Sequence, residues 1–319
     1  MLNNSIKENE QIFDLYWRFA TERQNIFFNR LNNKSAPWTS DYILQTYKFT
    51  NTYRASDRVS QYLINNVIYT GESYSEEDLI FRILLFKFFN KIETWKKLEN
   101  KFGSICLKSY DEKKYGNFLE ELLLKDDRIY SAAYIMPSGT TSFGNEKKHK
   151  NHLALLSYMF KDGIVMKINR CKSLEELFLL LLSYPTIGKF LAFQYSIDIN
   201  YSEICNFDEM SFVVAGPGAH RGIQKCFQNS SYTDEDLIRF VTENQEEEFR
   251  KRGLDFKRIG NRPLQLIDCQ NIFCELDKYT RVSNPELNFS NKRIKQKYEY
   301  SAKERINYAY PPKWHCILN

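Results

Sequence analysis

The fold prediction depends most on residues 174–200, LEELFLLLLSYPTIGKFLAFQYSIDIN. Two apolar runs flank a short turn that contains Pro185 and ends at Gly188, a pattern that predicts a helix, a tight turn and a second helix. Gly188 allows the main chain to turn sharply and to approach a partner closely. The free amides at the start of the second helix, next to Lys189, suit a phosphate group. The same pattern is also typical of an ordinary connection between two helices.

Most of the remaining chain has helical periodicity too. The predicted helices cover residues 8–31, 39–49, 56–67, 79–89, 152–160, 233–252 and 263–281. Residues 79–89 are apolar nearly all round, which predicts a core helix, and residues 130–136 suit a short strand or a buried extended segment. The sequence therefore predicts an all-α fold. We expect residues 1–319 to form one unit of two helical lobes, with the hairpin and the catalytic segment at about 173–227.

Composition bounds the class of protein. Of the 319 residues, 43% are hydrophobic and 27% are charged, which supports a sizeable core and excludes disorder as the main state. The mean hydropathy is −0.53, and no apolar run approaches the ~20 residues of a membrane-spanning helix. Seven cysteines, an odd count, and no signal-peptide pattern predict a cytoplasmic protein with reduced thiols. The net charge of +5 permits a nucleic-acid partner without requiring one.

The cysteines and histidines do not form a familiar metal-binding pattern. Cys269 and Cys274 are not accompanied by a second pair at zinc-like spacing. His149 and His152 do not belong to an HExxH motif. We therefore expect no metal and no cofactor.

The hairpin resembles that of the helix–hairpin–helix DNA glycosylases. Residues 184–192, YPTIGKFLA, are similar to the family pattern Leu-Pro-Gly-Val-Gly-x-x-Thr-Ala, with Thr186 in place of its first glycine. The catalytic aspartate of that family lies about 20 residues after the last glycine, and the resemblance places Asp208 there. Phe190 stands where bifunctional members carry their lyase lysine, so the resemblance implies a monofunctional enzyme.

A second resemblance spans roughly residues 15–315. It rests on YKFTNTYRASDR (47–58), FDEMSFVVAGPGAHRGI (207–223) and LIDCQNIFCELDKY (266–279). These segments are similar to the α-glutamyl/putrescinyl-thymine pyrophosphorylase-like family, which is related to the helical domain linked to 5-hydroxymethyluracil DNA kinases. The resemblance implies a protein that modifies, processes or excises large pyrimidine adducts.

Three groups of residues are candidates for a site. Residues 216–222, GPGAHRG, lack the P-loop pattern. Gly218, followed by His220 and Arg221 near a helix start, suits a phosphate or the charge on a leaving base. An ordinary turn with surface charge explains this segment equally well.

The second and third groups lie at either end of the chain. Tyr53, Arg54, Asp57 and Arg58 would form a pocket wall or a phosphate clamp, and Arg54 and Arg58 would share one face of a continuous helix. A structural Arg–Asp network explains them as well. The third group consists of Asp268, Glu275 and Lys278, which would line a base pocket or form core and surface pairs.

The leading prediction is a DNA glycosylase. Such an enzyme flips a base out of double-stranded DNA, and a carboxylate, here Asp208, stabilises the positive charge on the sugar. The expected substrate is a bulky modified pyrimidine of phage DNA, such as glucosylated 5-hydroxymethylcytosine, excised as an antiviral defence by a monomer without membrane contact. Two alternatives remain open. One is a base-hypermodification enzyme that displaces pyrophosphate from activated 5-hydroxymethyluracil, and the other is a non-catalytic DNA-binding module.

Overall fold

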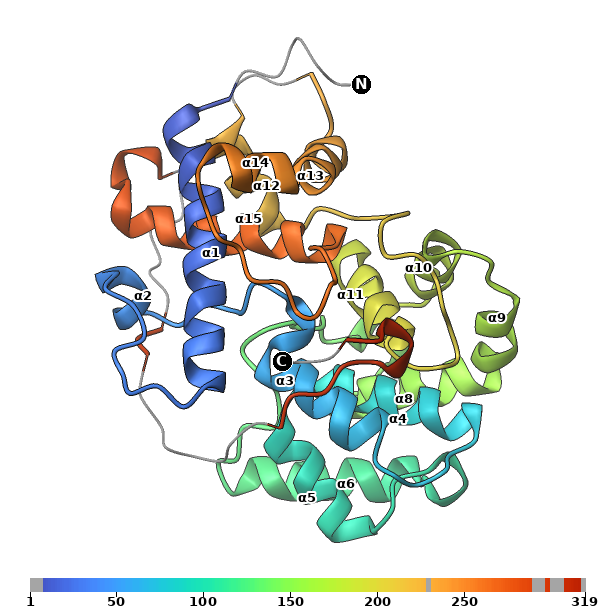
Figure 1. Ribbon diagram of the computed structural model, residues 1–319. Coiled ribbons are helices and arrows are strands. Elements are labelled where there is room, and N and C mark those ends of the chain that lie inside the picture. Colours follow the sequence, from blue (N-terminus) through green and yellow to red (C-terminus); the bar gives the residue numbers. More distant parts are fainter. Residues whose placement is uncertain (1–7, 228–230, 289–295, 299–306, 317–319) are drawn as a thin grey trace. The chain divides into compact units, whose positions relative to one another are not determined.

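The computed structural model describes residues 8–227, 231–288, 296–298 and 307–316, and it confirms the all-α prediction (Figure 1). These residues form fifteen α-helices. Within the same ranges, extended pairing is limited to isolated bridges, such as that between Glu8 and Phe227. None of the described helices is both long and apolar enough to cross a membrane. None of the seven cysteines forms a disulfide bond.

The chain divides into two compact units, and neither is continuous in sequence. Unit 1 comprises Met1–Asp57, Val213–Asn307 and Trp314–Asn319, and unit 2 comprises Arg58–Phe212 and Tyr308–Lys313.

Unit 1 is assembled around one long helix. Helix α15 (Leu266–Ser283) contacts α1 (Glu10–Leu31), α2 (Tyr42–Thr46), α12 (Pro217–Cys226), α13 (Asp234–Glu243) and the 3₁₀ turn η1 (Arg54–Ser56). Helix α1 buries a stripe of large rings that includes Phe13, Tyr16 and Trp17, and Tyr16 packs on Phe273 of α15. Aromatic rings of this size supply much of the apolar area that holds a small core together.

Helices α12 and α15 approach each other unusually closely. A Cβ atom on Gly222 would lie 2.1 Å from the carbonyl oxygen of Phe273, and one on Gly218 would lie 2.4 Å from Sγ of Cys274. The two glycines are four residues apart and therefore face the same way on α12. Their missing side chains permit the contact between the two helices.

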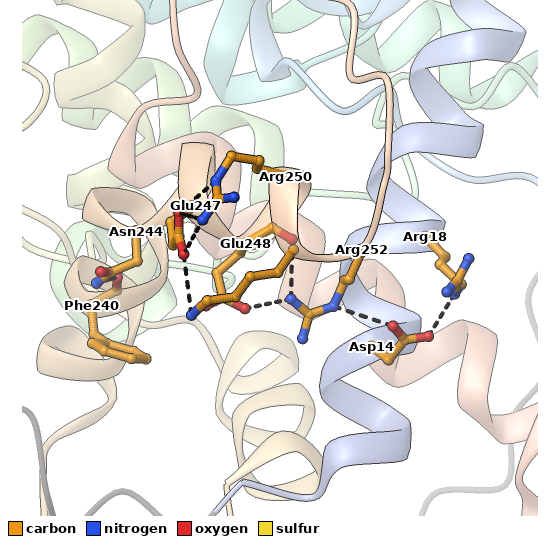
Figure 2. Close-up of polar contacts among 9 residues, drawn as sticks. Asp14, Arg18, Phe240, Asn244, Glu247, Glu248, Arg250 and Arg252 are labelled. Carbon is orange, nitrogen blue, oxygen red and sulfur yellow. Dashed lines mark hydrogen bonds and ion pairs between the residues drawn. The ribbon is translucent and has the colours of Figure 1, made fainter.

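Ion pairs connect α14 (Gln245–Lys251) to α1 on the surface of unit 1 (Figure 2). Arg252 pairs with Glu248 and with Asp14, the latter at 3.2 Å, and Asp14 also binds Arg18 at 2.5 Å. Separately, Arg250 pairs with Glu247. Because most of these groups are exposed, each pair adds little to stability.

Unit 2 is assembled around helix α4 (Glu76–Phe89), and the predicted core helix is confirmed. Residues 80–89 of α4 are all buried, and α4 contacts α5 (Ile92–Phe102), α8 (Lys148–Lys161), α9 (Ile164–Arg170) and α11 (Lys189–Asn200). The other elements are α3 (Arg58–Tyr62), the π-helix η2 (Leu63–Ile68), η3 (Leu107–Ser109), α6 (Glu112–Leu124), α7 (Thr140–Phe143) and α10 (Leu174–Leu182).

Several predicted boundaries were wrong. The helix expected over residues 39–49 is the short α2, which Asp41 caps at its start and which ends before the extended backbone of Tyr47. The helix expected over 56–67 begins as η1, breaks at the extended backbone of Asp57, and continues as α3 and η2. The helix expected over 233–252 is two helices that meet at Asn244. Residues 130–136 form no strand.

Candidate functional site

The hairpin segment joins two packed helices in unit 2. Helices α10 and α11 contact each other, and Tyr184 at the turn donates a hydrogen bond to Asp162 at 2.9 Å. Thr186 takes a left-handed conformation, with φ of 67°, in the position where the glycosylase pattern has glycine. Gly188 and Lys189 are exposed at the start of α11. Binding of a DNA strand by this turn stays a prediction.

Asp208 is exposed in the loop that follows α11. Its carboxylate accepts a hydrogen bond from the amide of Met210 at 2.9 Å, and its carbonyl oxygen accepts one from the Ser211 hydroxyl at 2.6 Å. These bonds are those of a turn-forming aspartate. The neighbouring Glu209, in contrast, is 5% exposed.

Residues 50–57 and helix α15 bring the second and third groups of candidates together in unit 1. The Arg54 amide donates to Asp268 at 2.8 Å, and the Thr50 amide donates to Glu275 at 3.2 Å. Asp268 also accepts from the Gln265 amide and thereby caps α15. Arg54, Asp268 and Glu275 are each less than 5% exposed. We refer to Arg23, Arg54, Asp57, Asp268, Glu275 and Lys278 as the loop–α15 cluster.

Asp57 is a titratable group of the cluster whose pKa lies near neutrality. Its Oδ1 accepts from the Asn51 amide at 2.7 Å. Burial, with a smaller contribution from the Glu275 carboxylate, raises the pKa of Asp57 from 3.8 to about 7, although the Asn51 amide and the cations of Arg23 and Arg54 act in the opposite direction. Asp57 can therefore exchange a proton near neutral pH.

The other ionisable groups of the cluster have different environments. Burial raises the pKa of Asp268, although the amides of Gln265 and Arg54 act against this. Burial disfavours the Lys278 ammonium, but Glu275, at 2.9 Å, and Cys274 together outweigh it and raise the pKa of Lys278. Arg23, in which burial lowers the pKa, donates to the carbonyl oxygen of Thr50 at 3.0 Å.

Two members of the second group form no hydrogen bond or ion pair with the cluster's carboxylates among the described residues. The Tyr53 hydroxyl donates to the carbonyl oxygen of Arg262 at 2.6 Å. Arg58 belongs to unit 2, where it forms an exposed pair with Glu93 at 3.2 Å. Because extended backbone at Asp57 separates η1 from α3, Arg54 and Arg58 do not share the face of one helix, and that expectation was wrong.

The glycine-rich group lies on α12. Gly218 and Gly222 pack against α15, as described above, while His220 is exposed and its Nδ1 lies 2.7 Å from Asp234. Arg221 binds the carboxylate of Asp277 through Nε at 3.0 Å.

Sequence reasoning missed a buried ion pair in unit 2. Lys87 of α4 and Asp198 of α11 lie 3.1 Å apart, and their side chains are 2% and 0% exposed. Lys87 also donates to Asn90 at 2.7 Å. The available signal was a charged residue within an apolar stretch of each helix, Lys87 in α4 and Asp198 in α11, since such charges are buried only when they are paired. Among the described residues, no cluster of three or more His, Cys, Asp or Glu side chains could hold a metal ion.

Comparison with known proteins identifies a family. Residues 10–289 match the family described as "5-hmdU DNA kinase, helical domain". A 5-hmdU DNA kinase of Bacillus phage SP10 is 25% identical over 288 residues, which are 85% of this chain and 45% of the relative. The chain thus spans a little less than half of that relative. No solved structure matches.

This match corrects the leading prediction. The family and the relative are described as DNA kinases, so the prediction of a monofunctional DNA glycosylase, a hydrolase with an antiviral role, was wrong. The physical signs agree, because Asp208 is exposed and engaged in a turn, whereas a carboxylate that stabilises a sugar cation acts best where water is excluded. The resemblance to the helical domain linked to 5-hydroxymethyluracil DNA kinases was correct, and the chain belongs to the family of 5-hmdU DNA kinase helical domains.

Proposed function

We propose that this chain acts in the hypermodification of pyrimidines in DNA and recognises 5-hydroxymethyluracil or an activated ester of it. The observation that carries the proposal is the family match over residues 10–289. A relative that shares this region is named a 5-hmdU DNA kinase, and a region common to the two chains is expected to serve reactions on the same base. DNA that carries modified bases is the proposed partner.

The proposed reaction is displacement of pyrophosphate from the activated hydroxymethyl group by an amine. The amine nitrogen forms a bond to the exocyclic carbon, the carbon–oxygen bond breaks, pyrophosphate leaves, and the nitrogen gives up a proton. The pattern G-x-x-x-x-G-K-[ST], which binds nucleotide phosphates in many kinases, does not occur in the 319-residue sequence. The displacement step requires no such loop in this chain.

Asp57 is the proposed acceptor of the amine proton. A general base works best when its pKa lies near the working pH, and burial raises the pKa of Asp57 to about 7. Asp57 is half-buried, so its carboxylate lies neither wholly in the core nor freely in solvent. The cations of Arg23 and Arg54 favour its ionised form, and they would keep a fraction of it ready to accept a proton.

The test compares duplexes that differ at one base. Duplexes containing thymine, 5-hydroxymethyluracil or its pyrophosphate ester are incubated with the protein and a primary amine, and the nucleosides are analysed by mass spectrometry. We expect an amine-substituted nucleoside from the ester alone, and its loss in Asp57→Asn. Asp14→Asn, in the surface network of Figure 2, serves as the control and should leave the yield unchanged. Release of a free base, or the same yield of substituted nucleoside from all three duplexes, would contradict the proposal.

One observation favours a second candidate function. The chain corresponds to 45% of its relative, and the family is described as one domain of the kinase, so the domain would bind modified DNA for catalysis that takes place elsewhere. Selective binding of the 5-hydroxymethyluracil duplex with no new nucleoside would support this binding role in place of the displacement reaction.

A further inference from the structure

A cluster of cations surrounds one buried carboxylate where α12 meets α15 in unit 1. Asp277, whose side chain is 2% exposed, binds Nζ of Lys225 at 3.0 Å and Nε of Arg221 at 3.0 Å. Arg281 contacts the same carboxylate at 2.5 Å. These cations lower the pKa of Asp277 although burial acts against them, so Asp277 is ionised at neutral pH. One negative charge is thus shared by several positive charges.

Lys225 and Arg221 together carry two positive charges, whereas the Asp277 carboxylate that they share carries one negative charge. Lys225 is 4% exposed, and its other contacts are neutral, namely the carbonyl oxygen of Asp277 and the hydroxyl of Thr280. Buried charge is costly unless it is compensated. An additional anion close to this cluster would therefore be bound favourably.

Arg221 is the member of the cluster that can reach such an anion. Its side chain is 29% exposed, and among the described residues only its Nε donates to an acceptor, the Asp277 carboxylate. The two terminal nitrogens of a guanidinium form a planar fork that matches two oxygens of a phosphate group. Because Asp277 holds Nε, and Gly218 and Gly222 fix α12 against α15, less side-chain entropy is lost when the fork binds.

The neighbouring residues on α12 extend a polar surface around Arg221. His220 is exposed, and its Nδ1 lies 2.7 Å from Asp234, which leaves Nε2 for another partner. Gln224 is also exposed and lies within four residues of both, so the three side chains share one side of the helix. A guanidinium and an amide donate hydrogen bonds to phosphate oxygens, and Nε2 of His220 does so when its imidazole carries both protons.

We propose that Arg221, with His220 and Gln224, forms a phosphate-binding site on α12, and that Asp277 and Lys225 are positioning residues for Arg221. The phosphate belongs either to the DNA backbone or to free pyrophosphate. The proposal rests on the proposed function in that DNA, or a product of its modification, is the ligand. It does not depend on chemistry at Asp57 or on selection of a modified base.

The main experiment measures binding of a labelled duplex that contains only unmodified bases, over a range of NaCl concentrations. Loss of one phosphate contact should reduce the slope of log K against log[salt] by about 1. We expect Arg221→Gln to show this reduction and to bind about tenfold more weakly at ~0.1 M salt, with Arg221→Lys intermediate. Arg250→Gln is the matched control, because Arg250 is a highly exposed arginine of unit 1 paired with Glu247. Wild-type affinity and slope in Arg221→Gln would overturn the proposal.

Gln224→Glu provides a second variant that does not disturb the packing, since Gln224 is exposed. The added negative charge should also weaken binding, while the melting temperature stays unchanged. Competition with inorganic phosphate and pyrophosphate then identifies the source of the ligand. Displacement of the duplex by pyrophosphate that requires Arg221 assigns the site to the free anion, and an Arg221-dependent duplex affinity without such displacement assigns it to the DNA backbone. Failure of base selectivity would leave both results intact, because the duplex carries no modified base.

Discussion

Asp57 combines two properties that usually conflict in one residue. The carboxyl group of Asp57 is partly removed from water. The charge of the nearby Glu275 carboxylate adds to the effect of burial and helps to raise the pKa of Asp57. Residues placed in this way commonly reduce the stability of the fold and serve a function. Because the raised pKa of Asp57 affects the free energy of unfolding, it can be tested by a stability measurement that needs no substrate.

The stability of the protein should depend on pH through Asp57. The folded state holds the Asp57 proton more tightly than the unfolded state, with a pKa of about 7 in place of 3.8. The contribution of this group therefore favours folding below about pH 4 and declines as the pH rises toward 7. Asn at this position cannot ionise, so Asp57→Asn should raise the free energy of unfolding by roughly 1–2 kcal/mol at about pH 8, after allowance for partial solvation, and by less at about pH 5. Thermal melts at the two pH values measure the difference, and an equal shift at both would contradict the assignment.

At the scale of helices, the contact between α12 and α15 depends on two glycines. Glycine inside a helix costs about 1 kcal/mol relative to alanine, so two of them within α12 indicate a structural need. The close approach of Phe273 and Cys274 identifies that need.

Gly222→Ala should destabilise unit 1 by about 2–4 kcal/mol. The new Cβ would lie 2.1 Å from a main-chain oxygen, and such a clash can be relieved only by moving one helix. Gly116→Ala is the matched control, because Gly116 lies in α6 and its Cβ would meet side-chain atoms at ordinary distances of 3.5 Å and more. Urea unfolding of both variants should show a loss for Gly222→Ala and no loss for Gly116→Ala. Equal stability of the two variants would show that α12 can shift without cost.

In unit 2, Arg82 holds the end of the π-helix η2. It is 1% exposed, and it donates to the carbonyl oxygens of Val67, Ile105 and Asn66 at 3.0, 2.9 and 3.3 Å. Arg82→Met should cost about 2–4 kcal/mol, because it leaves buried carbonyls without donors. The comparison is Arg58→Met, an exposed arginine of the same unit, for which a change below about 1 kcal/mol is expected. Chemical denaturation of the two variants distinguishes a structural Arg82 from a dispensable one.

The sequence predicted elements far better than contacts. The apolar pattern of residues 79–89 and the apolar run before Pro185 located α4 and α10 correctly, because periodicity is a local property. The role of Gly222 could not be predicted, because a glycine suited to an anion and a glycine that faces another main chain look alike without the partner helix. The pairing of Arg54 with Asp268 joins residues 214 positions apart, and no local pattern encodes it. Asp208 favoured the glycosylase prediction because its distance from Gly188 along the chain fits the glycosylase pattern. Its exposed position in a turn is not visible in the sequence.

At the scale of the whole molecule, the tail takes part in the core of unit 2. Residues Tyr308–Lys313 belong to that unit, and the Lys313 ammonium donates to the carbonyl oxygens of Asn200, Ser202 and Cys205, with the Ser202 contact at 2.8 Å. The first of these carbonyls ends α11, where a cation is favoured by the helix dipole.

Lys313→Ala should loosen the end of α11 without unfolding the chain. The loss of one half-buried cation from three carbonyls should cost about 1–3 kcal/mol and should act locally. Hydrogen exchange followed by mass spectrometry should show faster exchange in peptides covering residues 197–205, with peptides from α12 unchanged. Uniform acceleration over both regions would show instead that the two units unfold together.

The tail contact also determines when this protein can finish folding during its synthesis. Unit 2 receives most of its residues early, yet its last segment, Tyr308–Lys313, follows nearly all of unit 1 in the chain. A nascent polypeptide whose synthesis has not yet reached Tyr308 would carry a unit 2 that lacks this piece. Chaperones would therefore meet an incomplete domain until translation had passed Lys313, and a gene fragment that stops at Phe212 would encode the same unfinished intermediate.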